Sequence, residues 1–387
     1  MSKGNLTLLF NNFEKEHFGK DVFLVPDYLG RILGYDVTIV YPLSDTNKDF
    51  PDVFKGVKLI PIKLKGHVDS HYLYREFNFF LYILKNARRI NTMIRFHNSF
   101  QTKLLGIIYK IMNPKGKLYV KLDINEEKVA LVKNLGNIRG VIYKCITKLF
   151  LRSLDVVSCE TKSVYEMIKG CNNYEYDFGD KLLLLENGFD EDALSMMKIE
   201  EKDFSQKENC FITVGRLGTF QKNTELILEA LIDLDLKDWK FYFVGPTSLD
   251  FDEKIKDFFK TYPHLKNRVV FWGPIYDKEK LWSMYNMSKV FVLSSRSEGY
   301  PIVFGEAKRF RNFILTTPVG GSVEITENGK YGIIYSHQDS HELTTIMQAI
   351  VNGDININVY QDFNPRMVAW DNVLQPLLDK LNENGVC

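Results

Sequence analysis

The chain has 387 residues, of which 45% are apolar and 26% charged, and its formal net charge is +1. This length exceeds what one hydrophobic core usually serves and suits two domains. The near-zero charge excludes a strong overall field that would recruit nucleic acid. Apolar runs fall far short of the roughly 20 residues that cross a bilayer, and the amino terminus lacks a secretory pattern. These features predict a cytoplasmic protein without a transmembrane helix.

The first half of the chain alternates apolar strands with helical patterns, which is typical of βαβ units and a parallel sheet. Strands are predicted at residues 6–10, 37–41, 57–62, 93–96, 117–122, 155–159 and 182–185. A charged stretch at residues 190–209 follows and is the predicted linker. We therefore expect an N-terminal Rossmann-like domain at residues 1–190.

The second half repeats this alternation. Strands are predicted at residues 210–214, 241–244, 269–272, 290–293 and 313–315, with helices near 223–233, 253–262, 277–287 and 301–310. The pattern predicts a second doubly wound domain at residues 205–360. An amphipathic helix begins near Arg366 within the final segment 361–387 and is interrupted at Pro376.

Two carboxylates eight residues apart mark a loop that leads into a helix. Glu298 precedes Gly299-Tyr300-Pro301, and Glu306 follows. Pro301 suits a first helical position, so the next residues should open a helix whose free N–H groups attract an anion. A carboxylate accepts two hydroxyl hydrogen bonds at once. The segment therefore indicates a phosphate site flanked by acids that suit a ribose and a sugar.

Arg216 and Lys222 lie six residues apart, between a predicted strand and the next helix. Open α/β sheets bind ligands at the carboxyl ends of their strands, so both side chains should reach a ligand there. Two fixed cations can stabilise a diphosphate leaving group without a metal. No metal site is predicted, because the histidines and cysteines lack metal-ligand spacing. The structural alternative is an exposed Arg and Lys at a helix start, which the helix dipole disfavours.

Together these motifs resemble the family 4 glycosyltransferases, which are retaining enzymes of the GT-B fold with an E-x7-E signature. Further landmarks of that family occur in the same order at Asn187-Gly188-Phe189-Asp190, Val214-Gly215-Arg216-Leu217, Phe271-Trp272-Gly273-Pro274, Pro318-Val319-Gly320-Gly321 and Tyr331-Gly332-Ile333-Ile334. The resemblance covers about residues 155–345 and is looser over the first 150. It implies an α/β protein of two Rossmann-like, doubly wound domains that face a cleft, with a C-terminal helix that crosses back to the first domain.

The resemblance also implies roles for residues of the second domain. Glu306 would bind the ribose hydroxyls and Glu298 the donor sugar, while Arg216 and Lys222 would hold the diphosphate. Gly299, Tyr300 and Ile302 would supply backbone around the phosphates, Gly215 and Val303 would also contact the donor, and Phe271, Trp272 and Gly273 would bound the base pocket. The expected ligand is a nucleotide-diphosphate sugar, with UDP or GDP as the first choices, and no cofactor is expected to be bound.

In the first domain, Gly19 lies where the family has a glycine-rich loop, with one glycine where two are common. Many family members have a histidine at a strand end that contacts the sugar. Here Lys121-Leu122-Asp123 fills that place, and His97 follows a neighbouring predicted strand. Both His97 and Asp123 are therefore candidates for the acceptor side.

One predicted helix, at residues 141–154, has a cationic stripe. Lys144, Lys148 and Arg152 share one face, and the other face is expected to carry Ile142, Ile146 and Leu149. A stripe of this kind suits contact with anionic lipid headgroups, and it is also what an ordinary solvated helix face presents.

The sequence thus favours a retaining, metal-independent glycosyltransferase of bacterial surface polysaccharide or glycolipid synthesis. Its acceptor would be a glycan or a lipid-linked molecule, and the enzyme would lie in the cytoplasm or on the inner face of the cell membrane. One alternative is a nucleotide-sugar epimerase of the same fold, which would form product without an acceptor. The other is a catalytically silent partner subunit that binds the donor. The base, the donor sugar and the acceptor are left open.

Overall fold

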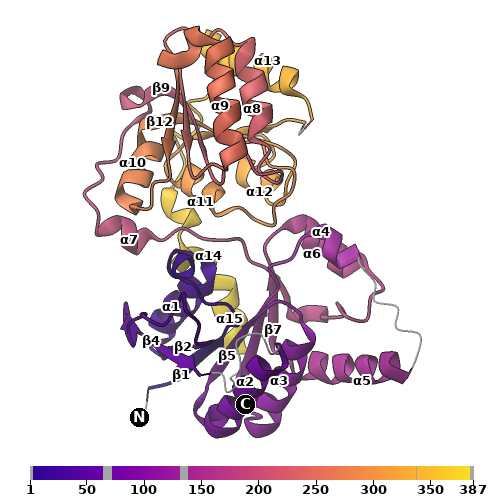
Figure 1. Cartoon of the computed structure of the whole chain (residues 1–387). Helices are drawn as coiled ribbons and strands as arrows, with labels where there is room; N and C mark the ends of the chain where they lie inside the picture. The colour runs from indigo at the N-terminus through magenta and orange to yellow at the C-terminus, as the bar shows by residue number, and fades with distance from the viewer. Residues whose placement is uncertain (1–2, 64–71, 131–137, 337, 384–387) are drawn as a thin grey trace. The chain divides into compact units, whose positions relative to one another are not determined.

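The computed structural model describes residues 3–63, 72–130, 138–336 and 338–383. The chain forms two compact units, unit 1 (Met1–Asn187 with Trp370–Cys387) and unit 2 (Gly188–Ala369) (Figure 1). Each unit is built on its own predominantly parallel sheet with helices packed against it, which confirms the predicted α/β class.

Unit 1 contains an eight-stranded sheet in the order β3-β4-β2-β1-β5-β6-β7-β8. Its strands are β1 (Asn5–Leu9), β2 (Asp36–Pro42), β3 (Val53–Phe54), β4 (Val57–Ile62), β5 (Thr92–Phe96), β6 (Lys117–Lys121), β7 (Val156–Cys159) and β8 (Leu182–Leu184). All neighbours pair in parallel except β3 and β4. The seven predicted strands are confirmed, whereas the two-residue β3 is too short to leave a pattern.

The helices of unit 1 are α1 (Asp21–Leu33), α2 (Tyr72–Asn86), α3 (Phe100–Met112), α4 (Glu126–Ala130), α5 (Ile138–Ser153), α6 (Lys162–Gly170), α14 (Trp370–Val373) and α15 (Gln375–Glu383). Two of its 3-10 helices are η1 (Lys15–Gly19) and η2 (Ala87–Arg89). Consecutive residues Leu8 and Leu9 of β1 belong to different cores, because side chains alternate across a strand. Helices α2, α3 and α5 share the core of Leu9, and α1, α14 and α15 share that of Leu8. The two sets therefore cover opposite faces of the sheet.

The C-terminal segment belongs to unit 1. Trp370, Leu374 and Leu377 are fully buried in the core beneath α1. The helix predicted from Arg366 with an interruption at Pro376 is a 3-10 helix, η6 (Pro365–Val368), followed by α14 and α15, which are separated at Leu374. Pro376 lies in the first turn of α15, where a missing N–H costs no helical hydrogen bond.

Unit 2 contains a six-stranded parallel sheet in the order β11-β10-β9-β12-β13-β14. Its strands are β9 (Glu208–Val214), β10 (Lys240–Val244), β11 (Val269–Gly273), β12 (Ser288–Leu293), β13 (Phe313–Thr316) and β14 (Gly332–Ile334). After β11 the chain crosses to the other side of β9 and continues with β12. The strand order therefore reverses between β9 and β12.

The helices of unit 2 are α7 (Glu191–Ser195), α8 (Thr224–Ile232), α9 (Leu249–Thr261), α10 (Lys278–Met287), α11 (Ile302–Arg309), α12 (Ser322–Thr326) and α13 (Ser340–Asn352). The stretch predicted as a linker carries α7, the 3-10 helix η4 (Phe204–Gln206) and the start of β9. Among the helices that the structure describes, none is long and apolar enough to cross a membrane.

We predict that Leu377→Ala destabilises unit 1 by about 2–5 kcal/mol, because it removes a fully buried side chain from the core. Urea-dependent hydrogen exchange of peptides from unit 1 measures this. Asn382→Ala, at an exposed position of α15, is the matched control and should change stability by less than about 0.5 kcal/mol. Equal effects of the two changes would mean that α15 contributes nothing to the core.

Candidate functional site

The candidate site of unit 2 lies where the strand order reverses. Parallel sheets bind ligands outside the carboxyl ends of their strands at such a point, because the loops on either side diverge there. The loop after β9 carries Arg216 and Lys222, and the loop after β12 carries Glu298. The fold thus brings these three predicted residues to one edge of one sheet.

An ion pair joins the two loops. The Nζ atom of Lys222 lies 2.5 Å from Oε1 of Glu298, and their side chains are only 17% and 11% exposed. The side-chain amide of Gln221 donates to the Ser297 carbonyl at 2.9 Å. Lys222, which the sequence predicts to bind a ligand phosphate, therefore forms an ion pair with Glu298, one of the two acids of the E-x7-E signature.

The loops at this edge approach one another as bare backbone. A Cβ atom on Gly245 would lie 1.7 Å from the Gly215 carbonyl oxygen, and one on Gly320 would lie 1.9 Å from that of Gly299. Gly245 also has a φ of +145°, which other residues rarely adopt. Glycine is required at these positions because any side chain would separate the loops.

Arg216 is exposed beside this pair and donates from Nη2 to Oε1 of Gln221 at 3.2 Å. Helix α11 begins at Ile302 with Pro301 as its N-cap, so the N–H groups of Ile302 and Val303 precede the first intrahelical acceptors. The Tyr300 ring is buried against Gly321 and meets Phe304 edge-on. This arrangement provides a cation and a helix start for an anion.

Glu306 is buried and held by helix α10. Its Oε1 accepts hydrogen bonds from Nζ of Lys278 at 2.7 Å and from Nε1 of Trp282 at 3.0 Å. Burial, together with the Glu306 carboxylate, raises the pKa of Tyr285 well above its ordinary value, so that phenol stays neutral. Sequence reasoning missed Lys278 and Trp282, which lie 28 and 24 residues before Glu306 and leave no spacing signal.

The last residues of β11 include one that packs in the core and one that is exposed. Phe271 stacks on Phe243 with ring centroids 4.4 Å apart, so it belongs to the core. Trp272 is exposed and lines an open pocket of about 740 Å³ with Ile275 and Tyr276. Gly273 follows with a φ of +68° and open space around its Cα. Of the three residues predicted to bound the base, Trp272 lines this aromatic pocket and Gly273 follows it in the chain, whereas Phe271 packs against the core.

In unit 1, the strand order reverses between β1 and β5. His97 follows β5 and Asp123 follows the adjacent β6, and Nδ1 of His97 lies 3.9 Å from Oδ2 of Asp123. Both side chains are half exposed, and both residues have positive φ, 64° and 44°. Strained residues of this kind concentrate at functional sites. The structure therefore places the two alternative candidates side by side.

A buried charge cluster lies beneath this pair. The Lys121 ammonium contacts Oδ2 of Asp21 at 2.8 Å and also the Glu160 carboxylate. Burial lowers the pKa of Lys121, but the two carboxylates outweigh it and hold the pKa well above its ordinary value. Gly19 ends η1 just before Asp21, the first residue of α1. The expected glycine loop is thus a 3-10 turn that leads into a helix.

Helix α5 differs from its expected orientation. Ile142 and Leu149, expected on the face opposite the cations, are 54% and 47% exposed. Its buried face instead carries Tyr143 and Thr147, whose hydroxyls accept hydrogen bonds from the buried Lys103 ammonium at 3.0 and 3.2 Å. Ile146, the third residue expected on that face, is partly buried against the core, so the prediction fails for Ile142 and Leu149, which lie at the surface beside the cations.

Residues 197–365 match the family model described as glycosyl transferases group 1. The chain is 29% identical over 185 residues to the amylovoran biosynthesis glycosyltransferase AmsD of Erwinia amylovora, an alignment that covers 44% of this chain and 49% of AmsD. The chain thus spans about half the length of this curated relative.

Two solved structures resemble the whole chain. A glycosyltransferase from Rickettsia africae is 14% identical, with a TM-score of 0.72 over 99% of both chains. Anabaena HepE, in complex with UDP and glucose, is also 14% identical, with a TM-score of 0.67 over 98% of this chain and 100% of HepE. These identities establish the fold alone, which is GT-B.

We predict that Lys222 and Glu298 are energetically coupled. A double-mutant cycle with Lys222→Met and Glu298→Gln should give a coupling free energy of about 2 kcal/mol in urea unfolding, because either single change leaves a largely buried charge unpaired. The control is the Lys254–Glu225 pair of the same unit, which is more exposed and should give less than about 1 kcal/mol. A coupling free energy near zero would show that this ion pair does not help to hold the two loops together.

Proposed function

We propose that this chain transfers a sugar from a nucleotide-diphosphate sugar to an acceptor, as the match of residues 197–365 to the glycosyl transferases of group 1 suggests. The observation that carries the proposal is the meeting of Arg216, Lys222 and Glu298 at the reversal point of the unit 2 sheet. Retention of anomeric configuration, implied by the resemblance to family 4, is part of this proposal.

In the proposed reaction, the donor diphosphate lies at the start of α11 and draws the Lys222 ammonium away from Glu298. Lys222 stays paired with an anion throughout, because the diphosphate replaces the Glu298 carboxylate as its partner. The Glu298 carboxylate is then free to bind the donor sugar. The freed carboxylate then accepts hydrogen bonds from hydroxyls of the donor sugar. Arg216, exposed on the same loop, joins Lys222 in stabilising the charge that grows on the leaving diphosphate. This clamp would remove the need for a metal.

Glu306 is proposed to bind the ribose. Lys278 and Trp282 hold its carboxylate through one oxygen, Oε1, so the group is oriented before a ligand arrives. A fixed carboxylate loses less entropy when it accepts a ribose hydroxyl than a mobile one. The aromatic pocket at Trp272 is proposed for the base, and the UDP in HepE makes UDP the first nucleotide to test before GDP.

The acceptor is proposed to bind unit 1 at His97 and Asp123. Nδ1 of His97 lies within hydrogen-bond distance of the Leu122 carbonyl, at 3.2 Å, which orients the imidazole, and Oδ2 of Asp123 lies 3.9 Å away. The name of AmsD places that relative in the synthesis of an exopolysaccharide, amylovoran. We therefore propose a glycan or lipid-linked acceptor in bacterial surface polysaccharide synthesis, and a cytoplasmic location.

Transfer is tested against the two alternative functions by product analysis with UDP-sugars. A nucleotide-sugar epimerase would convert the donor without any acceptor, and a silent donor-binding subunit would bind it without hydrolysis or transfer. Chromatography of the reaction, with and without bacterial glycolipid and with and without chelator, separates these outcomes. Loss of activity in chelator, restored by magnesium, would contradict the proposed metal-free clamp.

We predict that Arg216→Ala lowers the rate of donor turnover by about 10²-fold, because it removes a cation that stabilises developing charge. Steady-state kinetics on folded protein measure this. Lys260→Ala, which removes an exposed cation of α9 in the same unit, is the control and should leave kcat unchanged. Normal turnover in Arg216→Ala would refute its part in the clamp.

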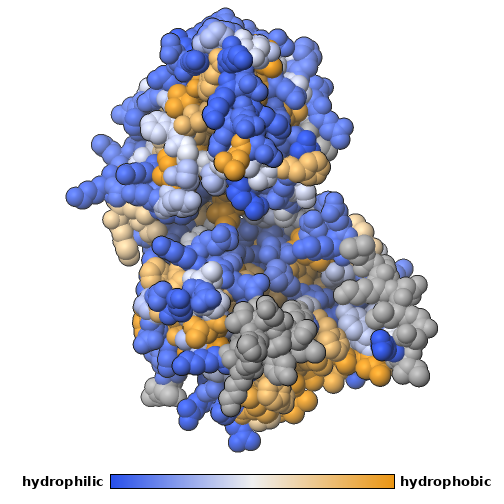
Figure 2. All heavy atoms as spheres, in the orientation of Figure 1, coloured by the Kyte–Doolittle hydropathy of each residue, from blue (hydrophilic) through white to orange (hydrophobic). Residues whose placement is uncertain are grey.

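The outer surface of unit 1 supports peripheral membrane contact. Helices α2, α3 and α5 pack on one face of the sheet and expose large apolar side chains. These include Phe77, Leu81, Leu84, Ile111, Val141, Ile142 and Leu149. Figure 2 shows apolar surface in the lower part of unit 1, where Figure 1 places these helices. Contiguous apolar surface of this kind commonly marks an interaction site.

The charge of this surface favours an anionic partner. Helices α3 and α5 contain no acidic residue, and α5 presents exposed Lys144, Lys148 and Arg152 next to its exposed Ile142 and Leu149. Apolar side chains flanked by cations suit the headgroup region of an anionic bilayer. We therefore propose that this face docks on the membrane that presents the acceptor.

We predict that the triple variant Lys144→Glu, Lys148→Glu and Arg152→Glu weakens binding to anionic vesicles by at least about 100-fold. Each cation contributes about 1 kcal/mol near such a surface, and three together give roughly this factor. Sedimentation with phosphatidylglycerol vesicles measures binding, with phosphatidylcholine as the neutral reference. The control reverses Lys256, Lys260 and Lys266, three exposed cations of unit 2, and should bind as the parent does. Equal binding of the α5 variant and the parent would show that these three cations form an ordinary solvated face that does not bind the membrane.

A further inference from the structure

Unit 2 has a second cavity, of about 400 Å³, at the edge of the sheet opposite the candidate site. Its lining includes Lys207, which directly precedes β9, and Arg311, which lies between α11 and β13. Both residues therefore stand where strands begin, whereas the signature acid Glu298 follows the end of β12. The cavity is distinct from the candidate donor site, because a strand's length separates the two edges.

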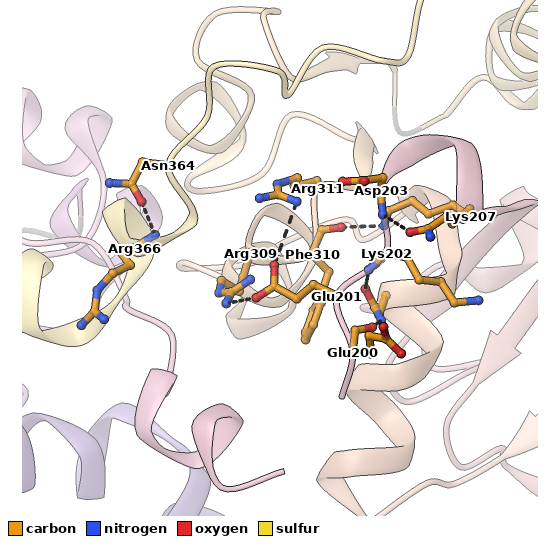
Figure 3. A network of polar contacts seen from close by, with 12 residues as sticks. Glu200, Glu201, Lys202, Asp203, Lys207, Arg309, Phe310, Arg311, Asn364 and Arg366 are labelled. Atoms are coloured by element: carbon orange, nitrogen blue, oxygen red, sulfur yellow. Dashed lines mark hydrogen bonds and ion pairs between the residues drawn. The ribbon is translucent and has the colours of Figure 1, made fainter. Parts of the chain in front are cut away.

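Lys207 forms the buried wall of this cavity, with only 5% of its surface exposed. Its Nζ donates to the Ser288 carbonyl at 3.0 Å. It also donates to the Phe310 carbonyl at 2.6 Å (Figure 3). A protonated ammonium has three N–H donors. Two carbonyl dipoles satisfy two of them but do not neutralise the charge. Lys207 thus differs from Lys103 and Lys121, which are buried against carboxylates.

The charged groups near Lys207 do not supply this missing anion. The pKa of Lys207 is lowered to about 7, mainly by burial and also by Arg311 and Lys202, although Cys210 and Glu201 raise it. Glu201 is engaged elsewhere, since its Oε1 accepts from Nη2 of Arg309 at 2.7 Å (Figure 3). Asp203, which lines the cavity, caps η4 through its side chain. Lys207 therefore has no dedicated carboxylate among the described residues around it.

Arg311 adds a second cation to the same cavity. Its backbone has a φ of +56°, a conformation that few residues other than glycine adopt. Its side chain is 32% exposed, and Nη1 lies 4.0 Å from Oε2 of Glu201, the outer limit of an ion pair. The guanidinium is therefore available to a ligand, and its planar fork suits a carboxylate or phosphate.

We propose that this cavity binds a small molecule through an oxyanion, a carboxylate or a phosphate, placed between Lys207 and Arg311. The oxyanion would accept the third N–H of the Lys207 ammonium and the fork of Arg311. The hydroxyl of Ser205 and the rings of Phe204 and Tyr360 would surround the rest of the ligand. The volume suits a small metabolite rather than a polymer.

Sulfate is the probe, because its charge stays constant between pH 6 and 8. Calorimetric titration of the full chain should show sulfate bound about tenfold more weakly at pH 8 than at pH 6, since Lys207 loses its proton as the pH rises through a pKa of about 7. Bound anion raises this pKa, so binding at pH 7.5 should take up protons. Buffers of different ionisation enthalpy measure that uptake.

Variants assign the binding to this cavity. Arg311→Gln changes a partly exposed side chain and should abolish the pH-dependent binding in a folded protein, whereas Arg216→Ala, at the candidate donor site, should keep it. Lys207→Met should leave weak, pH-independent binding if it folds. Binding without pH dependence, or pH-dependent binding that survives Arg311→Gln, would overturn the proposal. Failure of both acetate and inorganic phosphate to displace the sulfate would overturn it too, and the more effective of the two identifies the oxyanion.

Discussion

The parallel pairing of β9 with β12 is the constraint on which the candidate donor site depends. It sets the loop of Arg216 and Lys222 beside the loop of Glu298, although about 80 residues separate them in the chain. The Lys222–Glu298 ion pair then joins the two loops, and the hydrogen bond from Gln221 to the Ser297 carbonyl joins them again. A sheet without this reversal would carry the same residues at separate places.

Buried lysines form a second theme of the structure. Lys103 pairs with Glu175, and Lys121 lies between Asp21 and Glu160. A buried charge is tolerated when a partner of opposite charge compensates for lost hydration. Lys207 has two carbonyl acceptors instead, and its pKa falls accordingly to about 7. The contrast within one chain indicates that Lys207 is placed to receive an anion from outside the protein.

Local patterns predicted most of the fold. Strands such as β1 and β12 are buried apolar runs bounded by turns, so their limits agree with the prediction within two residues. Errors arose where tertiary contacts overrule the local pattern. Helix α5 buries Tyr143 and Thr147, whose hydroxyls accept hydrogen bonds from the buried Lys103 ammonium. The hydrophobic periodicity of α5 does not reveal that Lys103, on α3, packs against it.

The sequence by itself determined the two parallel sheets and the candidate residues Arg216, Lys222, Glu298 and Glu306, because strand alternation and loop-to-helix junctions are local features. Only the tertiary structure decided which of these residues touch. It paired Lys222 with Glu298, surrounded Glu306 with Lys278 and Trp282, and set His97 beside Asp123. Such contacts join residues 24 to 76 positions apart, and they follow from the order of strands, which no local spacing encodes.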